Sequence, residues 1–273
     1  MATGPERFDI AGDLLAGAEG DGRWNNLGYW KNAQHYTGAC RALAEIHGTA
    51  AALTASHRLL ELACGHGAAL DVWRDHFHVS RISVLEYRPE CVGHISSLDC
   101  PEVETVRAGR FDEPLDALFP GSSFDAVICV DAAYHASSLA AFIAAAESVL
   151  AEQGMLVFST LVLADARPTR WPGNALFNIA GLPRASLMTE SDLRQTVAAQ
   201  GLRVTAAEDI SDAVFAGFAD WVARRSPALN WREKYSAAWL KIAITARWCR
   251  RLAVSKKLRY VLVTVRRADN DGC

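Results

Sequence analysis

The sequence lacks several features that would assign it to a specialised class of protein. It has no apolar run of about 18 residues and no basic-then-apolar start, so we expect neither a transmembrane segment nor a signal peptide. None of its seven cysteines falls in a C-x-x-C pair or a Cys/His spacing suited to zinc, so we expect no metal. A net charge of -3 gives no overall field to attract a polyanion. We therefore expect a reduced, cytoplasmic protein, with a dimer possible.

The 273 residues, 51% of them hydrophobic, suffice for one domain with an elaboration. Between Arg58 and Thr160, short apolar runs alternate with helical patterns, which indicates βαβ units and a parallel sheet. Pro89 can open one of the helices, and residues 137–154 form another, with a serine cap and a terminal glycine. The strand-like runs are 58–63, 81–86, 101–108, 123–131 and 155–160.

Beyond Thr160 the pattern loosens. Thr189 and Asp192 come close to a capping box at the start of a helix, and residues 202–211 are the next strand. A helical stretch, 212–254, separates this strand from the last one, 259–265. We expect an α/β fold with a doubly wound, seven-stranded, mostly parallel sheet, an N-terminal helical arm and a helical insertion before the last strand. The expected units are an arm or lid (1–57), a core (58–211 and 256–268) and the insertion (212–255).

Two glycines follow the first strand in the motif "ELACGHGAAL". Gly65 and Gly67 allow the backbone to approach a ligand closely, and the helix that follows offers free N–H groups. The motif is not the dinucleotide fingerprint, because Leu70 stands where that fingerprint has its third glycine. The two glycines alone are weak evidence for a nucleotide site.

The second strand strengthens the evidence. Glu86 ends this strand about twenty residues beyond the glycine turn, where a carboxylate can accept hydrogen bonds from both hydroxyls of a ribose. The alternative is that Glu86 is an ordinary solvated strand end. This interpretation is the weaker one, because Glu86 is in register with the glycine turn.

The order of these motifs resembles that of class I S-adenosylmethionine-dependent methyltransferases, including their Rossmann-like fold. The resemblance rests on "ELACGHG", on Glu86, on "FDAVICVDAAYH" and on "GMLVFS", and it covers residues 58–160 closely. Ala63 departs from the family pattern, which usually has glycine there, and "VRAGRFDEPL" departs from the family's adenine-side signature. The resemblance implies an enzyme with S-adenosyl-L-methionine as its cofactor.

The resemblance also implies which residues hold that cofactor. The turn would line the methionine half, Glu86 the ribose, residues 110–112 the adenine, and the end of the fourth strand the methyl-donor centre. The implied cofactor residues are Tyr29, Trp30, Glu61, Ala63, Cys64, Gly65, Gly67, Glu86, Tyr87, Arg110, Phe111, Asp131 and Ala132.

The stretch "RWNNLGYWKNAQHY" (23–36) concentrates aromatic residues in a segment without a helix or strand period. Its "LGYW", together with "AYH" at 133–135, resembles a small-molecule subgroup of the family. In that subgroup the arm folds over the cofactor, which implies this position for Tyr29 and Trp30. The alternative is a packed terminal arm. The residues expected to contact the substrate are His35, Tyr36 and Trp171.

Seven of the eight tryptophans lie outside residues 58–160. Caps rich in aromatic residues over the carboxyl ends of the strands would form a mostly apolar pocket. Alternatively, most of these rings attach the insertion to the sheet, and we assign two or three of them to the pocket. The favoured acceptor is a small aromatic or apolar metabolite in biosynthesis, with the methylated atom undetermined.

His135, beside Tyr134, is the candidate general base, because it follows the fourth strand on the cofactor side. Methyl transfer is an in-line displacement, so a base is needed only when the acceptor must lose a proton. An equally favoured interpretation is that His135 caps the following helix or only orients the substrate.

Residues 247–267 contain eight basic residues and no acidic one. Such a segment is compatible with contact to nucleic acid or to an anionic membrane. We favour a solvated helix face followed by edge-strand charges, so nucleic acid is an unlikely partner and membrane contact is not favoured. The alternatives to a small-molecule enzyme are a nucleic-acid methyltransferase and a non-catalytic cofactor-binding subunit.

Overall fold

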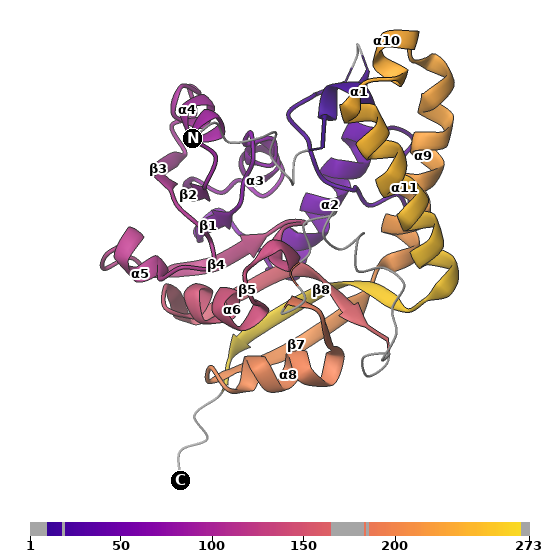
Figure 1. Cartoon of the computed structure of the whole chain (residues 1–273). Coiled ribbons are helices and arrows are strands. Elements are labelled where there is room, and N and C mark those ends of the chain that lie inside the picture. The colour runs from indigo at the N-terminus through magenta and orange to yellow at the C-terminus, as the bar shows by residue number, and fades with distance from the viewer. Residues whose placement is uncertain (1–9, 18–19, 165–182, 184–185, 269–273) are drawn as a thin grey trace, which may run out of the picture.

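The computed structural model describes residues 10–17, 20–164, 183 and 186–268. In this part of the chain one sheet has the order β3-β2-β1-β4-β5-β8-β7, with the short strand β6 paired to β5 (Figure 1). Every pairing is parallel except those of β8, which is antiparallel to both β5 and β7. The strands are β1 (Arg58–Leu62), β2 (Arg81–Glu86), β3 (Val103–Ala108), β4 (Phe124–Cys129), β5 (Leu150–Leu163), β6 (Met188–Thr189), β7 (Leu202–Asp209) and β8 (Leu258–Arg267). The predicted seven-stranded, mostly parallel sheet is confirmed, and β6 adds to it.

Helices cover both faces of the sheet, so successive residues of the inner strands enter two different cores. Leu59 and Ile128 face one core, whereas Leu60 and Val127 face the other. This double burial explains the nearly continuous apolar run of β4. The first core receives α2 (Tyr36–Ala50), α3 (Leu70–Asp75) and α4 (Pro89–Ser96), and the second receives α5 (Leu115–Leu118), α6 (Leu139–Glu147) and α8 (Glu190–Ala198).

The chain runs outward from β1 to β3 and returns to β4 beside β1. The strand order therefore reverses between β1 and β4. In open α/β sheets the crevice beyond the carboxyl ends of the strands at such a point is the usual place for a ligand. The topology thus places the glycine turn after β1, Glu86 at the end of β2 and Asp131 after β4 at one edge.

Several local signals act as predicted. Pro89 lies in the first turn of α4, and Thr189 forms a reciprocal capping box with Asp192 at the start of α8. Ser138 caps α6 by accepting a hydrogen bond from the backbone N–H of Ala141.

The predicted end of that same helix is wrong. α6 ends at Glu147 rather than at Gly154, because Leu150 is paired in the sheet with Phe124 and buried in the second core. A Cβ atom on Gly154 would lie 2.8 Å from the carbonyl oxygen of Phe124, so the glycine allows a close strand approach instead of ending a helix.

The predicted helical insertion between the last two strands is present. It consists of η3 (Asp212–Ala216), α9 (Gly217–Arg225), η4 (Ser226–Ala228), α10 (Trp231–Lys234) and α11 (Ala237–Ser255). α11 packs against α9 and η3. α9 and α11 lie beside α1 (Gly12–Ala16) and α2 at one end of the sheet (Figure 1). Within the described ranges, no helix is long and apolar enough to cross a membrane.

The N-terminal arm is packed against this insertion. The Trp30 ring stacks on Trp221 with 5.5 Å between ring centroids, and the backbone N–H of Trp30 donates to the carbonyl of Ala213. From the other side, the Trp221 indole donates to the carbonyl of Leu15. Arm and insertion thus share one buried interface, while the domain boundaries expected from the sequence stay a proposal.

This interface predicts opposite effects for the same substitution at two helical glycines. A Cβ atom at Gly217 would lie 2.1 Å from Cβ of Trp30, whereas a Cβ atom at Gly93 would meet nothing within 4 Å. We expect Gly217→Ala to lower the free energy of unfolding by at least about 2 kcal/mol, since the Trp30 backbone must move. Gly93→Ala, at an exposed position of α4, should raise it by about 0.5–1 kcal/mol.

Urea denaturation of both variants and the wild type measures the two changes. If Gly217→Ala were as stable as Gly93→Ala, the arm would not be packed on the insertion in solution.

Candidate functional site

The turn after β1 contains three residues in the left-handed backbone region. Their φ angles are +56° at Ala63, +59° at Gly65 and +72° at Gly67. Alanine in this region costs roughly 1–2 kcal/mol relative to the right-handed region. Ala63 adopts it nevertheless, with its N–H bonded to the carbonyl of Leu85 at 2.8 Å. The strand pairing therefore holds the turn in the conformation that a glycine would adopt without strain.

Glu86 fastens this turn to the end of β2. One carboxylate oxygen accepts the N–H of Gly65 at 2.8 Å. The other accepts the backbone N–H of Arg88 at 3.1 Å and its guanidinium Nε at 3.0 Å. Glu86 is buried, and its salt bridge to Arg88 is buried with it. The carboxylate thus shapes the turn as well as the cavity beside it.

Asp131 joins three distant segments at the end of β4. Its carboxylate accepts the backbone N–H of Leu27 at 2.7 Å, the hydroxyl of Tyr260 at 2.5 Å and the hydroxyl of Tyr134. Its own N–H donates to the Ser159 hydroxyl at 3.0 Å. Arm, η1 (Ala133–His135), β5 and β8 therefore meet at one residue.

Burial dominates the electrostatics of this cluster. It raises the pKa of Asp131 from its ordinary value, against the opposing effect of the hydrogen bonds from Tyr134, Tyr260 and Leu27. Burial, together with the charge of Asp131, raises the pKa of both tyrosines well above the ordinary value. Both phenols therefore stay protonated at neutral pH and act as donors.

A cavity opens at this edge of the sheet and collects eight of the residues predicted for the site. Those at or just after the ends of β1, β2 and β3 are Ala63, Glu86, Tyr87 and Phe111. Those that follow β4 are Asp131, Ala132, Tyr134 and His135. The sequence positions span 63 to 135, so the fold brings together what the chain separates.

Other predicted site residues lie outside the described wall of this cavity. Cys64, Gly65 and Gly67 form the turn itself, and Glu61 is buried, where its carboxyl accepts the indole N–H of Trp73 at 2.7 Å. Arg110 is exposed and paired with Asp112 at 3.0 Å. A cofactor role for these residues stays a prediction.

The aromatic residues of the arm lie outside the described wall of this cavity. Trp30 is buried against Trp221, and Tyr36 is buried with its hydroxyl donating to the carbonyl of Asn26 at 2.9 Å. Tyr29 and exposed His35 are also absent from the described cavity wall. This placement supports packing of the arm, so direct contacts of these four residues with cofactor or substrate stay predictions. Trp171 lies outside the described residues.

The arm instead reaches the cavity through Asn25, Asn26 and Leu27. The space above the glycine turn is narrow, because a Cβ atom on Gly65 would lie 3.3 Å from the side-chain oxygen of Asn25. In the sequence, the signal for this contact is the pair of asparagines between Trp24 and the "LGYW" segment.

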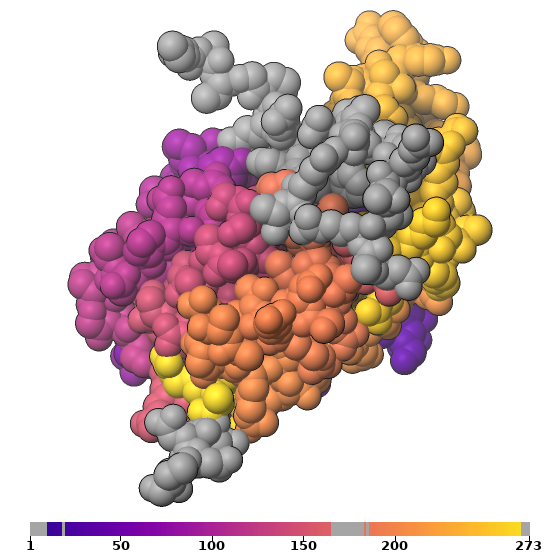
Figure 2. Space-filling view, turned by 60° about the horizontal axis from the view of Figure 1, so that its bottom comes forward, coloured from indigo at the N-terminus to yellow at the C-terminus, as the bar shows by residue number. Residues whose placement is uncertain are grey.

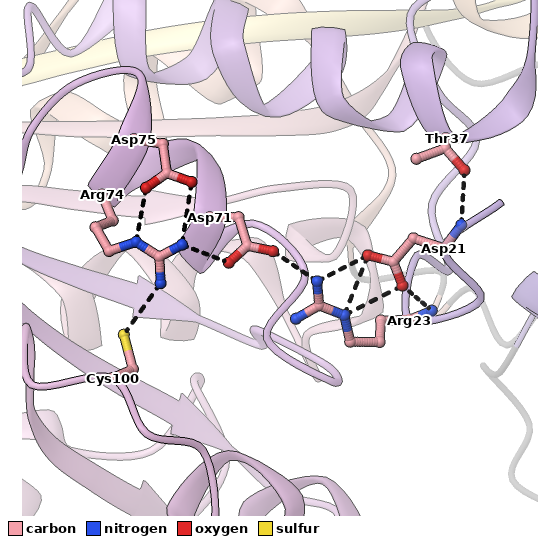
Figure 3. Close-up of polar contacts among 7 residues, drawn as sticks. All are labelled: Asp21, Arg23, Thr37, Asp71, Arg74, Asp75 and Cys100. Carbon is pink, nitrogen blue, oxygen red and sulfur yellow. Dashed lines mark hydrogen bonds and ion pairs between the residues drawn. The ribbon is translucent and has the colours of Figure 1, made fainter.

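A chain of ion pairs fastens the arm to the helix that follows the turn (Figure 3). Arg23 binds Asp21 at 2.8 Å and Asp71 of α3 at 2.5 Å. Arg74 extends the chain from Asp71 at 3.2 Å to Asp75 at 2.7 Å. These groups are about one-third exposed or more, so each pair contributes on the order of 1 kcal/mol or less. Their effect is to hold the arm in place over the turn.

The insertion supplies the rest of the wall. Lys241, Ile244, Thr245, Trp248 and Leu252 of α11 face the cavity opposite the strand ends. Trp248 belongs to the set of tryptophans that we considered for a pocket. No sequence signal identified Tyr260, because it lies in a buried strand far along the chain from Asp131.

Glu61 generates a prediction about the pH dependence of stability. Burial raises its pKa from the usual 4.5 to about 8, the charge of Glu86 adds to the rise, and the hydrogen bond from Trp73 opposes it. The folded protein therefore holds a proton that the unfolded chain releases. This contribution to stability is complete below pH 4.5 and is lost as the pH rises through about 8.

Glu61→Gln keeps an acceptor for Trp73 and cannot ionise. We expect the free energy of unfolding of the wild type to fall relative to this variant by on the order of 4 kcal/mol between those two pH values. Urea denaturation across the pH range measures it, with exposed Glu152→Gln as the control that should follow the wild-type curve. Parallel curves for wild type and Glu61→Gln would mean that Glu61 is already ionised when folded.

Comparison with known proteins agrees with this geometry. A family model described as a methyltransferase domain matches residues 29–207. No curated protein sequence matches the chain.

Solved structures show the same fold. The [4+2]-cyclase SpnF is 22% identical, with a TM-score of 0.63, and the match covers 89% of this chain and 86% of that one. The mycolic acid cyclopropane synthase CmaA1, complexed with SAH and CTAB, is 14% identical, with a TM-score of 0.72 and 92% of each chain covered. A geranyl diphosphate C-methyltransferase from Streptomyces coelicolor A3(2) is 11% identical, with a TM-score of 0.61, 83% of this chain and 80% of that chain covered.

At these identities the structural likenesses establish the fold, while the family match extends from the arm to β7. The turn, the acidic end of β2 and the wall after β4 lie inside the matched residues. The chain belongs to the methyltransferase domain family, and it is an enzyme that uses S-adenosyl-L-methionine as its cofactor.

Proposed function

We propose that the enzyme transfers the methyl group of S-adenosyl-L-methionine to a small, largely apolar or aromatic acceptor in a biosynthetic reaction. One observation carries this proposal. A single cavity joins the cofactor-type strand ends, with Ala63 and Glu86, to a wall of α11 that contains Ile244 and Trp248. The site therefore combines a polar half with an apolar half, as small-molecule sites do.

The residues at the strand ends fit the cofactor. Gly65 and Gly67 carry no side chain that would obstruct a ligand at the turn, and Asn25 lies just above Gly65. We assign the methionine half to the turn and Asn25, the ribose to Glu86 and the adenine side to Phe111. When bound, the cofactor supplies a methyl group on a sulfonium cation. The carboxylates of Glu86 and Asp131 in the wall complement that charge.

His135 and Tyr134 take different roles in this proposal. The Tyr134 hydroxyl donates to Asp131, and its raised pKa keeps it protonated, so it orients the wall and does not remove a proton. His135 is half-buried on the 3-10 turn after β4 and lines the cavity beside the Tyr134 ring, with 4.4 Å between ring centroids. We assign to His135 the role of general base, which removes the proton of an acceptor that must lose one.

The names of the structural relatives support an organic small molecule as acceptor. One relative is a mycolic acid cyclopropane synthase, and another is a C-methyltransferase of geranyl diphosphate. Apolar acceptors of this kind would suit a wall built from Ile244, Trp248 and Leu252. A cytoplasmic location and a possible dimer remain predictions from the sequence.

The cofactor assignment predicts a difference between two asparagines of the arm. Asn25 lies over the turn, whereas Asn32 is exposed and absent from the described cavity wall. We expect Asn25→Ala to weaken binding of S-adenosyl-L-homocysteine about tenfold, as one lost hydrogen bond to a charged group would. Asn32→Ala should bind like the wild type.

Isothermal titration calorimetry measures both affinities, with thermal denaturation to confirm that the variants are folded. Tyr29→Ala belongs in the same series, because a larger loss there than at Asn25 would assign the cover of the cofactor to the ring. If the wild type does not bind S-adenosyl-L-homocysteine, the proposed site is wrong.

His135 generates a separate prediction. Once an acceptor with an exchangeable proton is found, His135→Ala should lower kcat by about 10²–10⁴ while leaving calorimetric binding of S-adenosyl-L-homocysteine unchanged. His135→Gln is the matched variant that keeps a polar group without the base. Full turnover in His135→Ala would show that proximity alone drives the transfer.

A further inference from the structure

The insertion presents large apolar side chains to solvent on α10, at its C-cap and on α11. The exposed fractions are 69% for Trp231, 74% for Tyr235, 50% for Leu240 and 44% for Ile244. Leu240, Ile244, Arg247 and Arg251 recur every three or four residues and therefore form one stripe along α11. The opposite side of that helix is buried in the core. We call Trp231, Tyr235, Leu240, Ile244, Arg247 and Arg251 the α10–α11 face.

This face lies on the outside of the molecule. α10 and α11 form one margin of the space-filling view, at the upper right (Figure 2). In Figure 1 the two helices project beyond the sheet on the side of the arm. Exposed aromatic and aliphatic side chains concentrated on one such margin mark a contact surface more often than scattered apolar residues do.

The charged residues of the α11 part of this face have a single sign, whereas α10 contains Glu233, which caps the start of its own helix. α11 contains Lys241, Arg247, Arg250 and Arg251 and no acidic residue. Arg250 is paired with Asp220 at 2.6 Å. Among the described residues, no ion pair is recorded for Arg247 or Arg251, and both are exposed. Two cations thus stand in the same stripe as the apolar side chains.

This combination favours one kind of partner. Aliphatic, aromatic and basic residues on one helix face are the features of helices that lie in the interface of an anionic bilayer. Nucleic acid would use the cations and could stack on the aromatic rings, but it would gain little from exposed Leu240 and Ile244. A second copy packed on the same stripe would offer Arg247 and Arg251 no acidic partner, because α11 contains no acidic residue.

The face continues into the cavity. Ile244 is exposed and also lines the cavity, and the next cavity residues of α11 are Thr245 and Trp248. The apolar stripe therefore leads from solvent to the half of the cavity that we assign to the acceptor. A surface touching this stripe would lie beside that half.

We propose that the α10–α11 face binds the surface of an anionic lipid bilayer, so that the acceptor half of the cavity lies next to the membrane. The membrane contact is argued from the exposed residues of the α10–α11 face alone. Entry of an apolar acceptor from the bilayer rests in addition on the proposed function. From the sequence, membrane contact of residues 247–267 was not favoured, because the sequence showed the charge of this segment alone. The exposed apolar stripe of α11 now favours it.

Flotation of the protein with lipid vesicles tests the contact. We expect the wild type to bind phosphatidylcholine vesicles containing about one-third phosphatidylserine at about 0.1 M salt, and to bind pure phosphatidylcholine weakly. Each surface cation contributes about fivefold to such binding, so Arg247→Gln/Arg251→Gln should lower the partition coefficient about 25-fold. Trp231→Ala/Tyr235→Ala should lower it about tenfold and should do so at high salt as well.

The matched control is Arg107→Gln/Arg266→Gln, which removes the same charge from two exposed arginines outside this face. It should bind vesicles like the wild type. Calorimetric binding of S-adenosyl-L-homocysteine, measured for each variant, separates a lost membrane contact from a misfolded protein. It also separates failure of this proposal from failure of the cofactor site.

Four results would overturn the proposal. The first is a wild type that does not float with anionic vesicles. The second is an equal loss of binding in the control and in Arg247→Gln/Arg251→Gln, which would show attraction by overall charge alone. The third is a wild type that binds tRNA but not vesicles, which would assign the face to nucleic acid. The fourth is a wild type that does not bind vesicles and forms a dimer that Trp231→Ala/Tyr235→Ala dissociates, which would assign the face to a second copy.

Discussion

The carboxylate of Asp131 is the group on which the rest of the site depends. It is buried at the end of β4 with a φ angle of +53°, and its three donors are Leu27 of the arm, Tyr134 of η1 and Tyr260 of β8. A buried carboxylate that lost these donors would be costly, since each unsatisfied polar group costs about 1–3 kcal/mol or more. The need of this carboxylate for hydrogen-bond donors therefore holds the arm, the end of β4 and β8 together.

This requirement explains how an arm without regular structure can form part of a cavity wall. The backbone N–H of Leu27 donates to Asp131, and with this segment fixed Asn25 lies at the glycine turn and Asn26 lines the same cavity. The rings of Trp30 and Tyr36 lie away from that contact. Trp30 packs the arm against Trp221 of the insertion, and Tyr36 binds the backbone of the arm itself through its hydroxyl. Polar residues of the arm line the site, and aromatic residues hold the arm there.

Much of the fold could be predicted, because it follows from short-range signals and from burial. β4 was predicted as an apolar run, and it is a strand buried on both faces; the cap of α8 at Thr189 follows from local hydrogen bonding. The end of α6 was not predicted, because residues 148–154 have a composition that suits either a helix or a strand. Only the pairing of Leu150 with Phe124 decides between the two.

The sequence by itself determined the residues at the carboxyl ends of β1, β2 and β4, because a strand pattern and its following turn are local and a parallel sheet gathers such ends at one edge. It thereby determined that Glu86 and His135 share a cavity. Only the tertiary structure decided that Tyr260 completes the cluster at Asp131, that Asn25 rather than Trp30 lies at the turn, and that α11 turns an apolar stripe to solvent. These facts depend on contacts between residues far apart in the chain and on which side of a helix remains uncovered, and no local pattern encodes either.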